Sequence, residues 1–253
     1  MSQVIELDGG ELSAYVAEPP GTVRGGVVVI HEIWGLIDHI KDVADRLVQQ
    51  GYVAVAPDLL SGIGISPDVG QELHRIRATG GAEEQTKFQP MLREKLAPMQ
   101  SPEFGRSAIS ALSRTVDYLA GRADIEGRIG VLGFCFGGSY SFALAAADSR
   151  IRAAVPFYGE PPQLADVGKI ACPVLAFYGE RDTRLTDNLP KVSKAMLEAG
   201  VDFTWEVYPS VGHAFFNDTN PHTYDPGIAT DAWTRTLAFL DRNLAPATSG
   251  QLT

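Results

Sequence analysis

Short apolar runs alternate with amphipathic stretches along most of this chain. Six runs of four to six residues are rich in β-branched and aromatic side chains, and most show no regular alternation of apolar and polar positions. They occupy residues 27–30, 53–56, 129–132, 153–157, 174–178 and 203–208. This pattern is typical of strands that are buried on both faces of a sheet.

Between these runs, apolar residues recur at the spacing of amphipathic helices. Helices are expected over residues 40–50, 104–119, 140–147, 189–199 and 230–244. Strands that alternate with helices predict an α/β fold, with a mostly parallel central sheet and helices on both faces. The segment 7–16, around Asp8-Gly9-Gly10, predicts a short antiparallel hairpin at the N-terminus. We expect residues 1–253 to form a single domain.

Two segments interrupt the alternation. Residues 59–101 are rich in glycine, proline and charge, and they contain a helical pattern only near residues 69–79. We expect an excursion from the sheet, which is either a lid or pocket wall or a plain surface loop. The tail, residues 245–253, is small and polar, and we expect it to be disordered.

Composition and charge narrow the class of protein. The chain has 253 residues, of which 45% are hydrophobic, so it can bury a substantial core. Its formal net charge of −10 argues against nucleic-acid binding, which needs a surplus of Lys and Arg. No basic start precedes an apolar segment at the N-terminus, and no apolar run approaches the roughly 18 residues of a membrane span. We therefore expect a cytoplasmic monomer without membrane contact.

The cysteines and glycines indicate neither a metal nor another cofactor. Cys135 and Cys172 are too few for a disulfide framework, and they lack the CxxC spacing of a zinc site. Cys172 opens a predicted strand and is expected to be a buried, unreactive thiol. His31-Glu32 is not a metal-binding HExxH helix, because Gly35 stands where the second histidine is needed. The chain also lacks the glycine patterns of dinucleotide and P-loop sites.

The motif Gly-Phe-Cys-Phe-Gly-Gly at residues 133–138 lies between a predicted strand and a predicted helix. Its glycines allow the tight strand-to-helix turn of a nucleophile elbow, in which neighbouring Cβ atoms would collide. Cys135 stands at the centre of the turn, where serine is usual. Most free cysteines are small buried hydrophobic groups, but a position framed by glycines favours a nucleophile.

A nucleophilic thiol needs a nearby base, and the base needs an orienting acid. In hydrolases with such an elbow, an acid and then a histidine follow the nucleophile, each after a later strand. Asp182 follows the run 174–178, and His213 follows the run 203–208. Although Asp182 also suits a simple turn, chain order favours a triad of Cys135, Asp182 and His213.

Four other histidines compete for the role of base. They are His31, His39, His74 and His222. His39 and His74 fall in polar, helix-like surroundings, and His222 falls in a loop. Position after the last long strand therefore favours His213.

Two backbone amides are expected to form an oxyanion hole. One belongs to Phe136, which follows the nucleophile at the positive end of the elbow helix, and the other to Ile33, after the run 27–30. The loop that holds Ile33 also places Glu32 beside an apolar strand end. From the residues alone, Glu32 is as well explained as an ordinary loop acid.

Taken together, these residues resemble the dienelactone hydrolase family, whose members are cysteine-dependent enzymes of the α/β-hydrolase fold. The similarity covers nearly the whole chain. It rests on the segments 31–35, 51–59, 133–138, 157–159 and 212–215. The resemblance implies a Cys-His-Asp triad, here Cys135, His213 and Asp182, that cleaves a small ester or lactone through a thioester. It also implies that Glu32 contacts the resting thiol and takes its proton when substrate binds.

The resemblance places Trp34, Tyr158, Phe216 and Asn217 around the substrate. Members that cleave dienelactone hold the substrate carboxylate with two arginines, one shortly after the catalytic histidine and one in the excursion. Asn217 stands in place of the first, and asparagine cannot form a bidentate clamp on a carboxylate. The candidates for the second are Arg75, Arg77 and Arg93.

Three functions follow in order of preference. The first is hydrolysis of an enol lactone, because a thiolate expels stable leaving groups more readily than simple alkoxides. The second is a general carboxylesterase or thioesterase that acts on another small ester. The third is a noncatalytic binding or redox-sensing protein, although such a protein has no need of Asp182 and His213.

Overall fold

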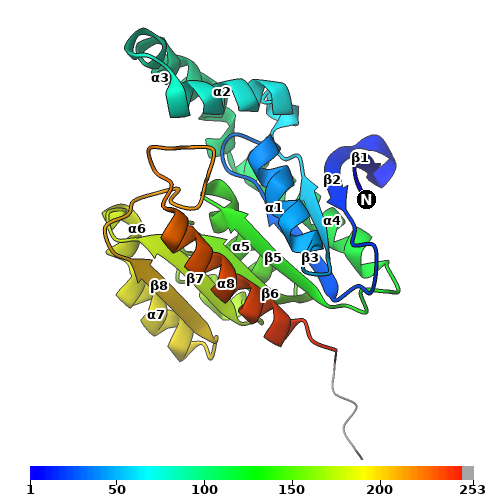
Figure 1. Ribbon diagram of the computed structural model, residues 1–253. Coiled ribbons are helices and arrows are strands. Elements are labelled where there is room, and N and C mark those ends of the chain that lie inside the picture. Colours follow the sequence, from blue (N-terminus) through cyan, green and yellow to red (C-terminus); the bar gives the residue numbers. More distant parts are fainter. Residues whose placement is uncertain (247–253) are drawn as a thin grey trace, which may run out of the picture.

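A mixed sheet forms the centre of the molecule (Figure 1). The computed structural model describes residues 1–246, without the side chain of Asp8. Within this range, eight strands follow the order β1-β2-β4-β3-β5-β6-β7-β8. Their bounds are β1 (Ser2–Leu7), β2 (Leu12–Ala17), β3 (Gly25–Ile30), β4 (Tyr52–Pro57), β5 (Ile129–Phe134), β6 (Ile151–Phe157), β7 (Val174–Gly179) and β8 (Phe203–Tyr208). β3 to β8 are parallel, whereas β2 is antiparallel to both β1 and β4.

This architecture confirms the predicted α/β-hydrolase fold and its N-terminal hairpin. The first strand of the hairpin begins at Ser2, earlier than predicted. Its start is not visible in the sequence, because most of its positions are exposed and form no apolar run. The tail that we expect to be disordered falls mostly outside the described range, since residues 247–253 are not part of it.

Helices cover both faces of the sheet, as predicted (Figure 1). Their bounds are α1 (Asp38–Val48), α2 (Pro67–Thr79), α3 (Ala82–Leu96), α4 (Pro102–Ala120), α5 (Phe136–Ala147), α6 (Thr183–Thr186), α7 (Leu189–Glu198) and α8 (Pro226–Asn243). Short 3₁₀ turns occupy Asp8–Gly10, Ser61–Ile63, Ala97–Gln100 and Val167–Lys169. α1 and α8 lie on one face, and α4 and α5 lie on the other. Within residues 1–246, no helix combines the length and apolar character that a membrane span requires.

Each of the six predicted apolar runs lies inside an observed strand. Every position of β3, β4, β5 and β7 is buried, which agrees with their unbroken apolar sequence. β8 differs, because it lies at the edge of the sheet and leaves Thr204 and Trp205 exposed. The prediction of burial on both faces is therefore wrong for β8.

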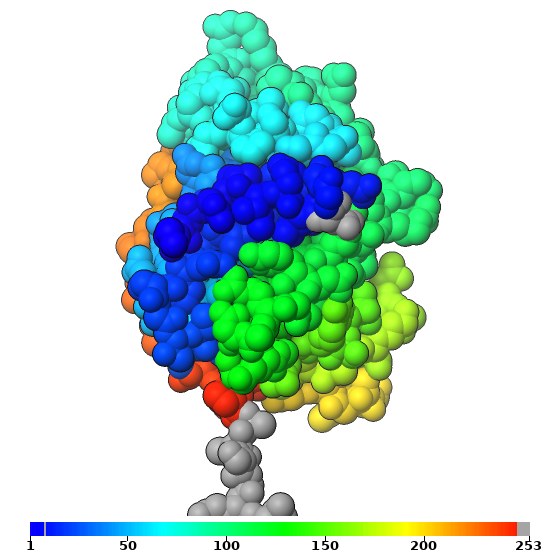
Figure 2. Space-filling model, turned by 90° about the vertical axis from the view of Figure 1, so that its right-hand side faces the viewer, coloured from blue at the N-terminus to red at the C-terminus, as the bar shows by residue number. Residues whose placement is uncertain are grey.

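The excursion, residues 59–101, contains a helical hairpin of α2 and α3 that projects from one end of the molecule (Figures 1 and 2). α2 confirms the helix predicted near residues 69–79, and the Ser66 hydroxyl caps it by accepting the Val69 N–H. α3 was not predicted. Phe88 is the one buried residue of this helix and Pro90 lies inside it, so its sequence shows no apolar stripe.

Candidate active site

Cys135 lies in the sharp turn between β5 and α5. Its backbone has φ 55° and ψ −114°, a conformation that costs a non-glycine residue about 1–3 kcal/mol. Glycines make the turn possible. A Cβ atom on Gly133 would lie 2.2 Å from the Gly137 carbonyl oxygen, and one on Gly137 would lie 2.1 Å from the Ile30 carbonyl oxygen. The turn therefore has the geometry expected of an elbow, with Cys135 at the carboxyl end of β5.

We expect Gly137→Ala to destabilise the protein by about 3 kcal/mol or more, because the added Cβ would collide with backbone atoms, which cannot move aside as a flexible side chain can. Gly168→Ala is the matched control, since nothing lies within 4 Å of its added Cβ. Guanidinium unfolding curves followed by circular dichroism measure both changes. Equal stability of the two variants would contradict the close contact between α5 and β3.

The loops after β7 and β8 lie against each other. The Arg181 N–H donates to the Val211 carbonyl oxygen at 2.9 Å. Gly179, the last residue of β7, permits this approach, because a Cβ atom there would lie 2.4 Å from the Gly212 carbonyl oxygen. Asp182 thereby faces the histidine of the neighbouring loop.

His213 bonds to Asp182 through its Nδ1 atom, which lies 2.5 Å from Asp182 Oδ2. Burial favours the neutral imidazole, but hydrogen bonds to Asp182 and to Cys135 outweigh it and raise the pKa of His213 to about 10. The raised pKa favours the protonated imidazole at neutral pH, and His213 borders the same cavity as Cys135. This arrangement suits a thiolate–imidazolium pair that a carboxylate orients.

The residues expected to form the oxyanion hole lie on adjacent backbone segments. Ile33 follows β3 and lines the same cavity as Cys135, and Phe136 is the first residue of α5. The contact between Gly137 and Ile30 brings the start of α5 against the end of β3. Amides from two such segments, one at a helix N-terminus, suit a developing oxyanion.

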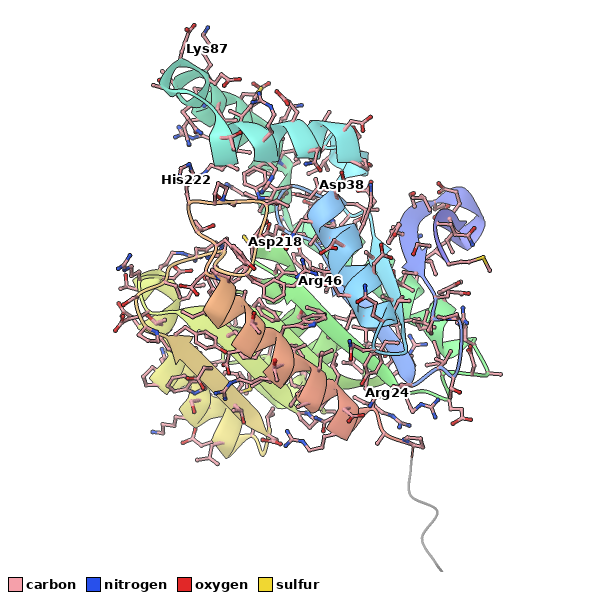
Figure 3. All side chains as sticks on the ribbon, in the orientation of Figure 1. Arg24, Asp38, Arg46, Lys87, Asp218 and His222 are labelled. Atoms are coloured by element: carbon pink, nitrogen blue, oxygen red, sulfur yellow. The ribbon has the colours of Figure 1, made fainter. Side chains whose placement is uncertain are left out.

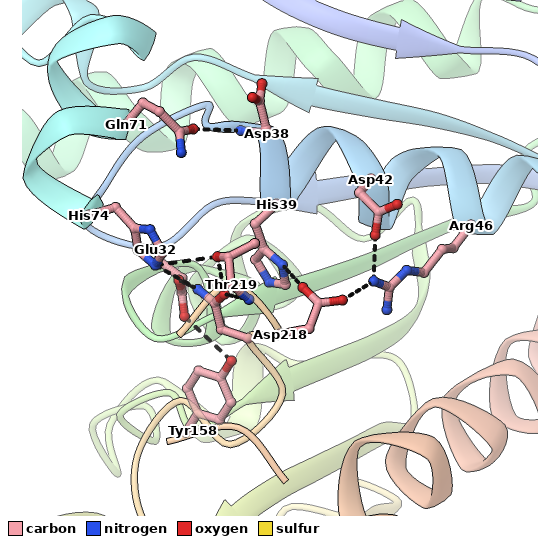
Figure 4. Close-up of polar contacts among 11 residues, drawn as sticks. Glu32, Asp38, His39, Asp42, Arg46, Gln71, His74, Tyr158, Asp218 and Thr219 are labelled. Carbon is pink, nitrogen blue, oxygen red and sulfur yellow. Dashed lines mark hydrogen bonds and ion pairs between the residues drawn. The ribbon is translucent and has the colours of Figure 1, made fainter. Parts of the chain in front are cut away.

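Glu32 is only 2% exposed, and two neutral groups hold its carboxylate (Figure 4). The Asn217 amide donates to Oε2 at 2.6 Å, and the Tyr158 hydroxyl donates to Oε1 at 3.4 Å. Burial and the nearby charges of Glu32 and Cys135 raise the pKa of Tyr158 well above its usual range, so this hydroxyl remains a donor. Glu32 is thus a fixed buried carboxylate and not an exposed loop acid.

Cys135, Glu32 and His213 border one cavity of about 400 Å³. The other lining residues are Ile33, Trp34, Arg77, Gln89, Leu92, Ala214, Asn217, Asn220 and Thr223. Arg77 comes from α2, and Gln89 and Leu92 come from α3. The excursion is therefore a wall of this cavity rather than a plain surface loop.

The residues expected around the substrate divide into two groups. Trp34 and Asn217 line the cavity, although Asn217 is already bonded to Glu32. Tyr158 is 1% exposed and reaches the site through its bond to the same carboxylate. The prediction that Phe216 contacts the substrate is wrong. Its ring packs in the core, with 5.2 Å between its centroid and that of Phe134, and it does not line the cavity.

The three candidate arginines have different positions. Arg77 lines the cavity. Arg75 forms ion pairs with Glu72 and Glu84 on the exposed side of the excursion. Arg93 is exposed and does not line the cavity. Arg77 is therefore the arginine of the excursion that can meet a bound substrate.

Two of the competing histidines are buried. His39 and His74 lie in polar, helix-like stretches of sequence, but they are only 2% and 3% exposed. His39 lies 3.1 Å from Asp218, which also pairs with Arg46 at the surface of α1 (Figure 3). The signal was present for His39, because it precedes Val43 by four residues and so belongs to the buried stripe of α1.

Two further residues discussed in the sequence, His31 and Cys172, are buried. His31 is fully buried, with Nδ1 donating to the Glu32 carbonyl oxygen and Nε2 accepting the Leu59 N–H. Cys172 is 5% exposed, and burial raises the pKa of its thiol to about 12, as expected of an unreactive cysteine. Within residues 1–246, no group of three or more His, Cys, Asp or Glu side chains could hold a metal ion.

Comparison with known proteins identifies the family. A model of the dienelactone hydrolase family matches residues 12–244. The protein named “Putative carboxymethylenebutenolidase” from Saccharolobus solfataricus is 32% identical over 252 residues, which cover 94% of this chain and 96% of that protein. The solved structure named “Putative Dienelactone Hydrolase” from Klebsiella pneumoniae has a TM-score of 0.79 and 27% identity, and covers 95% of this chain and 98% of that one. The chain therefore belongs to the dienelactone hydrolase family and is a carboxylic ester hydrolase of the α/β-hydrolase fold.

Proposed function

We propose that this enzyme opens a small enol lactone with Cys135 as the nucleophile. The observation that carries the proposal is the pairing of His213 with Asp182 across 2.5 Å, at a cavity that Cys135 of the elbow also borders. A protonated His213 stabilises the thiolate that attacks. Cys135 and His213 border a cavity large enough for a small substrate.

The reaction proceeds in two steps. In the first, the Cys135 sulfur forms a bond to the lactone carbonyl carbon, and the amides of Phe136 and Ile33 stabilise the oxyanion. The ring C–O bond then breaks, and the enolate leaves as part of the acyl chain and takes a proton from His213. In the second step, His213 accepts a proton from water, the resulting hydroxide attacks the thioester, and the C–S bond breaks to restore the thiolate.

Glu32 acts before these steps as the acceptor of the proton of the resting Cys135 thiol, and it returns this proton to the sulfur after the second step. Two features support this role: Glu32 borders the same cavity as Cys135, and its carboxylate is held by neutral donors rather than by a guanidinium. Its two hydrogen-bond donors, Tyr158 and Asn217, carry no formal charge. Binding of substrate displaces water from the cavity and favours this transfer.

Arg77 is the proposed partner of a substrate carboxylate. We expect Arg77→Gln to raise KM for a carboxylate-bearing lactone roughly 10- to 100-fold, the usual range for a hydrogen bond to a charged group. A neutral activated ester should be hydrolysed with an unchanged KM. Arg75→Gln is the matched control, because Arg75 lies outside the cavity in ion pairs with Glu72 and Glu84. Equal effects of the two variants on KM would refute this role of Arg77.

The proposed activity is tested by the loss of the ultraviolet absorbance of dienelactone. An acyl thioester and a neutral activated ester are assayed in parallel. Fast turnover of dienelactone supports enol-lactone hydrolysis. Turnover of the thioester or the neutral ester alone would replace this substrate class with the general carboxylesterase or thioesterase. Absence of turnover on all three, together with ready peroxide oxidation of Cys135, would favour the redox-sensing alternative.

A further inference from the structure

The excursion reaches the buried carboxylate of Glu32 through one histidine. His74 of α2 is 3% exposed, and its Nε2 atom lies 3.4 Å from Asn217 Nδ2 and 3.5 Å from Thr219 Oγ1 (Figure 4). The Trp34 ring packs edge-on against the imidazole, with 5.7 Å between centroids. A titratable side chain of the cavity wall is thus two hydrogen bonds away from the carboxylate that borders the nucleophile.

The direction of these hydrogen bonds follows from the Asn217 side chain. Its Oδ1 atom accepts from the Thr219 N–H at 3.0 Å and from the Thr219 hydroxyl at 2.6 Å. The other end of the amide is therefore the NH₂ group, which has two protons to donate. One goes to Glu32 Oε2 at 2.6 Å, and the other points to His74 Nε2. His74 consequently accepts at Nε2 and carries its proton on Nδ1.

We propose that His74 is a positioning residue for catalysis, which acts as a neutral acceptor that holds the Asn217 amide in place on Glu32. The position of α2 therefore determines the orientation of the Glu32 carboxylate, because His74 of α2 contacts Asn217 and Asn217 bonds to Glu32. This inference rests on the proposed role of Glu32 as the acceptor of the Cys135 proton.

The surroundings of His74 favour its neutral form. Burial lowers the pKa of His74, the Glu32 carboxylate opposes this effect, and the nearby His39 of α1 reinforces it. Protonation would place an N–H on Nε2 opposite the Asn217 NH₂, so that two donors would face each other. Turning the amide over would not help, because Oδ1 would then face the Glu32 carboxylate and the Thr219 donors would lose their acceptor.

A second contact of α2 provides a control. Gln71 Oε1 accepts the Asp38 N–H at 3.2 Å, which ties α2 to the start of α1 without any link to Glu32 (Figure 4). Gln71→Ala removes a bond that docks α2, whereas His74→Leu removes the bond that orients Asn217. His74→Gln keeps an acceptor at this position, because the Oε1 atom of glutamine can take the place of Nε2.

The kinetic test is a double-mutant cycle with p-nitrophenyl acetate, in which the acylation burst is measured. His74→Leu is expected to lower the burst rate roughly tenfold, as loss of one oriented hydrogen bond does, and His74→Gln should restore most of it. In a Glu32→Gln background, His74→Leu should have no further effect. Gln71→Ala should leave the burst rate within about twofold of wild type. An undiminished effect of His74→Leu in the Glu32→Gln background would overturn the proposal.

A second readout does not depend on catalysis. Two-bond ¹H–¹⁵N spectra of the side-chain imidazoles report which nitrogen of His74 carries the proton. We expect the Nδ1–H form at neutral pH, and a proton on Nε2 would overturn the assigned direction of the hydrogen bonds. If wild type turns over none of dienelactone, the thioester and the neutral ester, the proposed function fails, whereas the His74 spectrum still decides whether Nε2 can accept from Asn217.

Discussion

Cys135→Ala is expected to lower kcat for ester or lactone hydrolysis by about 10⁴-fold or more, the usual loss when a covalent nucleophile is removed. The cause is specific to the proposed mechanism, because no other described side chain at the elbow can form the acyl bond. The fold should be unaffected, because the substitution leaves the glycines of the turn in place and removes only the sulfur atom, which creates a small space.

Cys172→Ala is the matched control for this prediction. It removes the other thiol of the chain, which is buried and has a pKa raised to about 12, so it should leave kcat unchanged. Progress curves with dienelactone and with an activated ester measure both variants, and thermal melts confirm that they are folded. A Cys135→Ala enzyme that keeps a tenth of the wild-type rate would exclude Cys135 as the nucleophile.

Asp182→Asn is expected to lower kcat about 10²- to 10⁴-fold, the range seen when the orienting acid of a triad is replaced. The amide cannot accept the Nδ1–H bond and stabilise the imidazolium as the carboxylate does across 2.5 Å. His213 would then lose one of the interactions that raise its pKa, so it would stabilise the thiolate less.

The same variant makes a prediction about stability and pH. The pKa of His213 is raised from 6.5 to about 10, so its pairing stabilises the folded state fully below pH 6.5 and loses this contribution as the pH rises toward 10. Asp182→Asn should flatten this part of the stability profile, which urea titrations from pH 6 to 10.5 measure. Glu180→Gln, an exposed acid two residues away, is the control. Identical profiles for wild type and Asp182→Asn would contradict the pairing of His213 with the carboxylate.

Strong local requirements made much of this molecule predictable. The elbow was recognisable because only glycine tolerates backbone atoms 2.2 Å from a Cβ position, which leaves a mark in the sequence. The parallel strands β3, β4, β5 and β7 were recognisable because every position in them is buried. Chain order then selected Asp182 and His213 as partners of Cys135. The expected cytoplasmic monomer remains a prediction.

Features that depend on contacts between distant segments were not predictable. α3 has no apolar stripe, and it is held by α2 and by its place over the cavity. Asn217 was expected near the substrate, but it bonds to Glu32, 185 residues away. The burial of His74 is not predictable, because nothing in its neighbourhood along the chain reveals that Asn217 and Trp34 enclose it. Such pairings arise only when the sheet has brought the loops together.

The most direct test of the account is mass spectrometry of the protein after rapid acid quenching with dienelactone, in the Asp182→Asn variant, which should release the acyl group slowly. The account predicts that the intact protein gains the mass of one acyl group and that the modified peptide contains Cys135. An acyl group on any other residue, or product formation under single-turnover conditions without any covalent adduct, would contradict it.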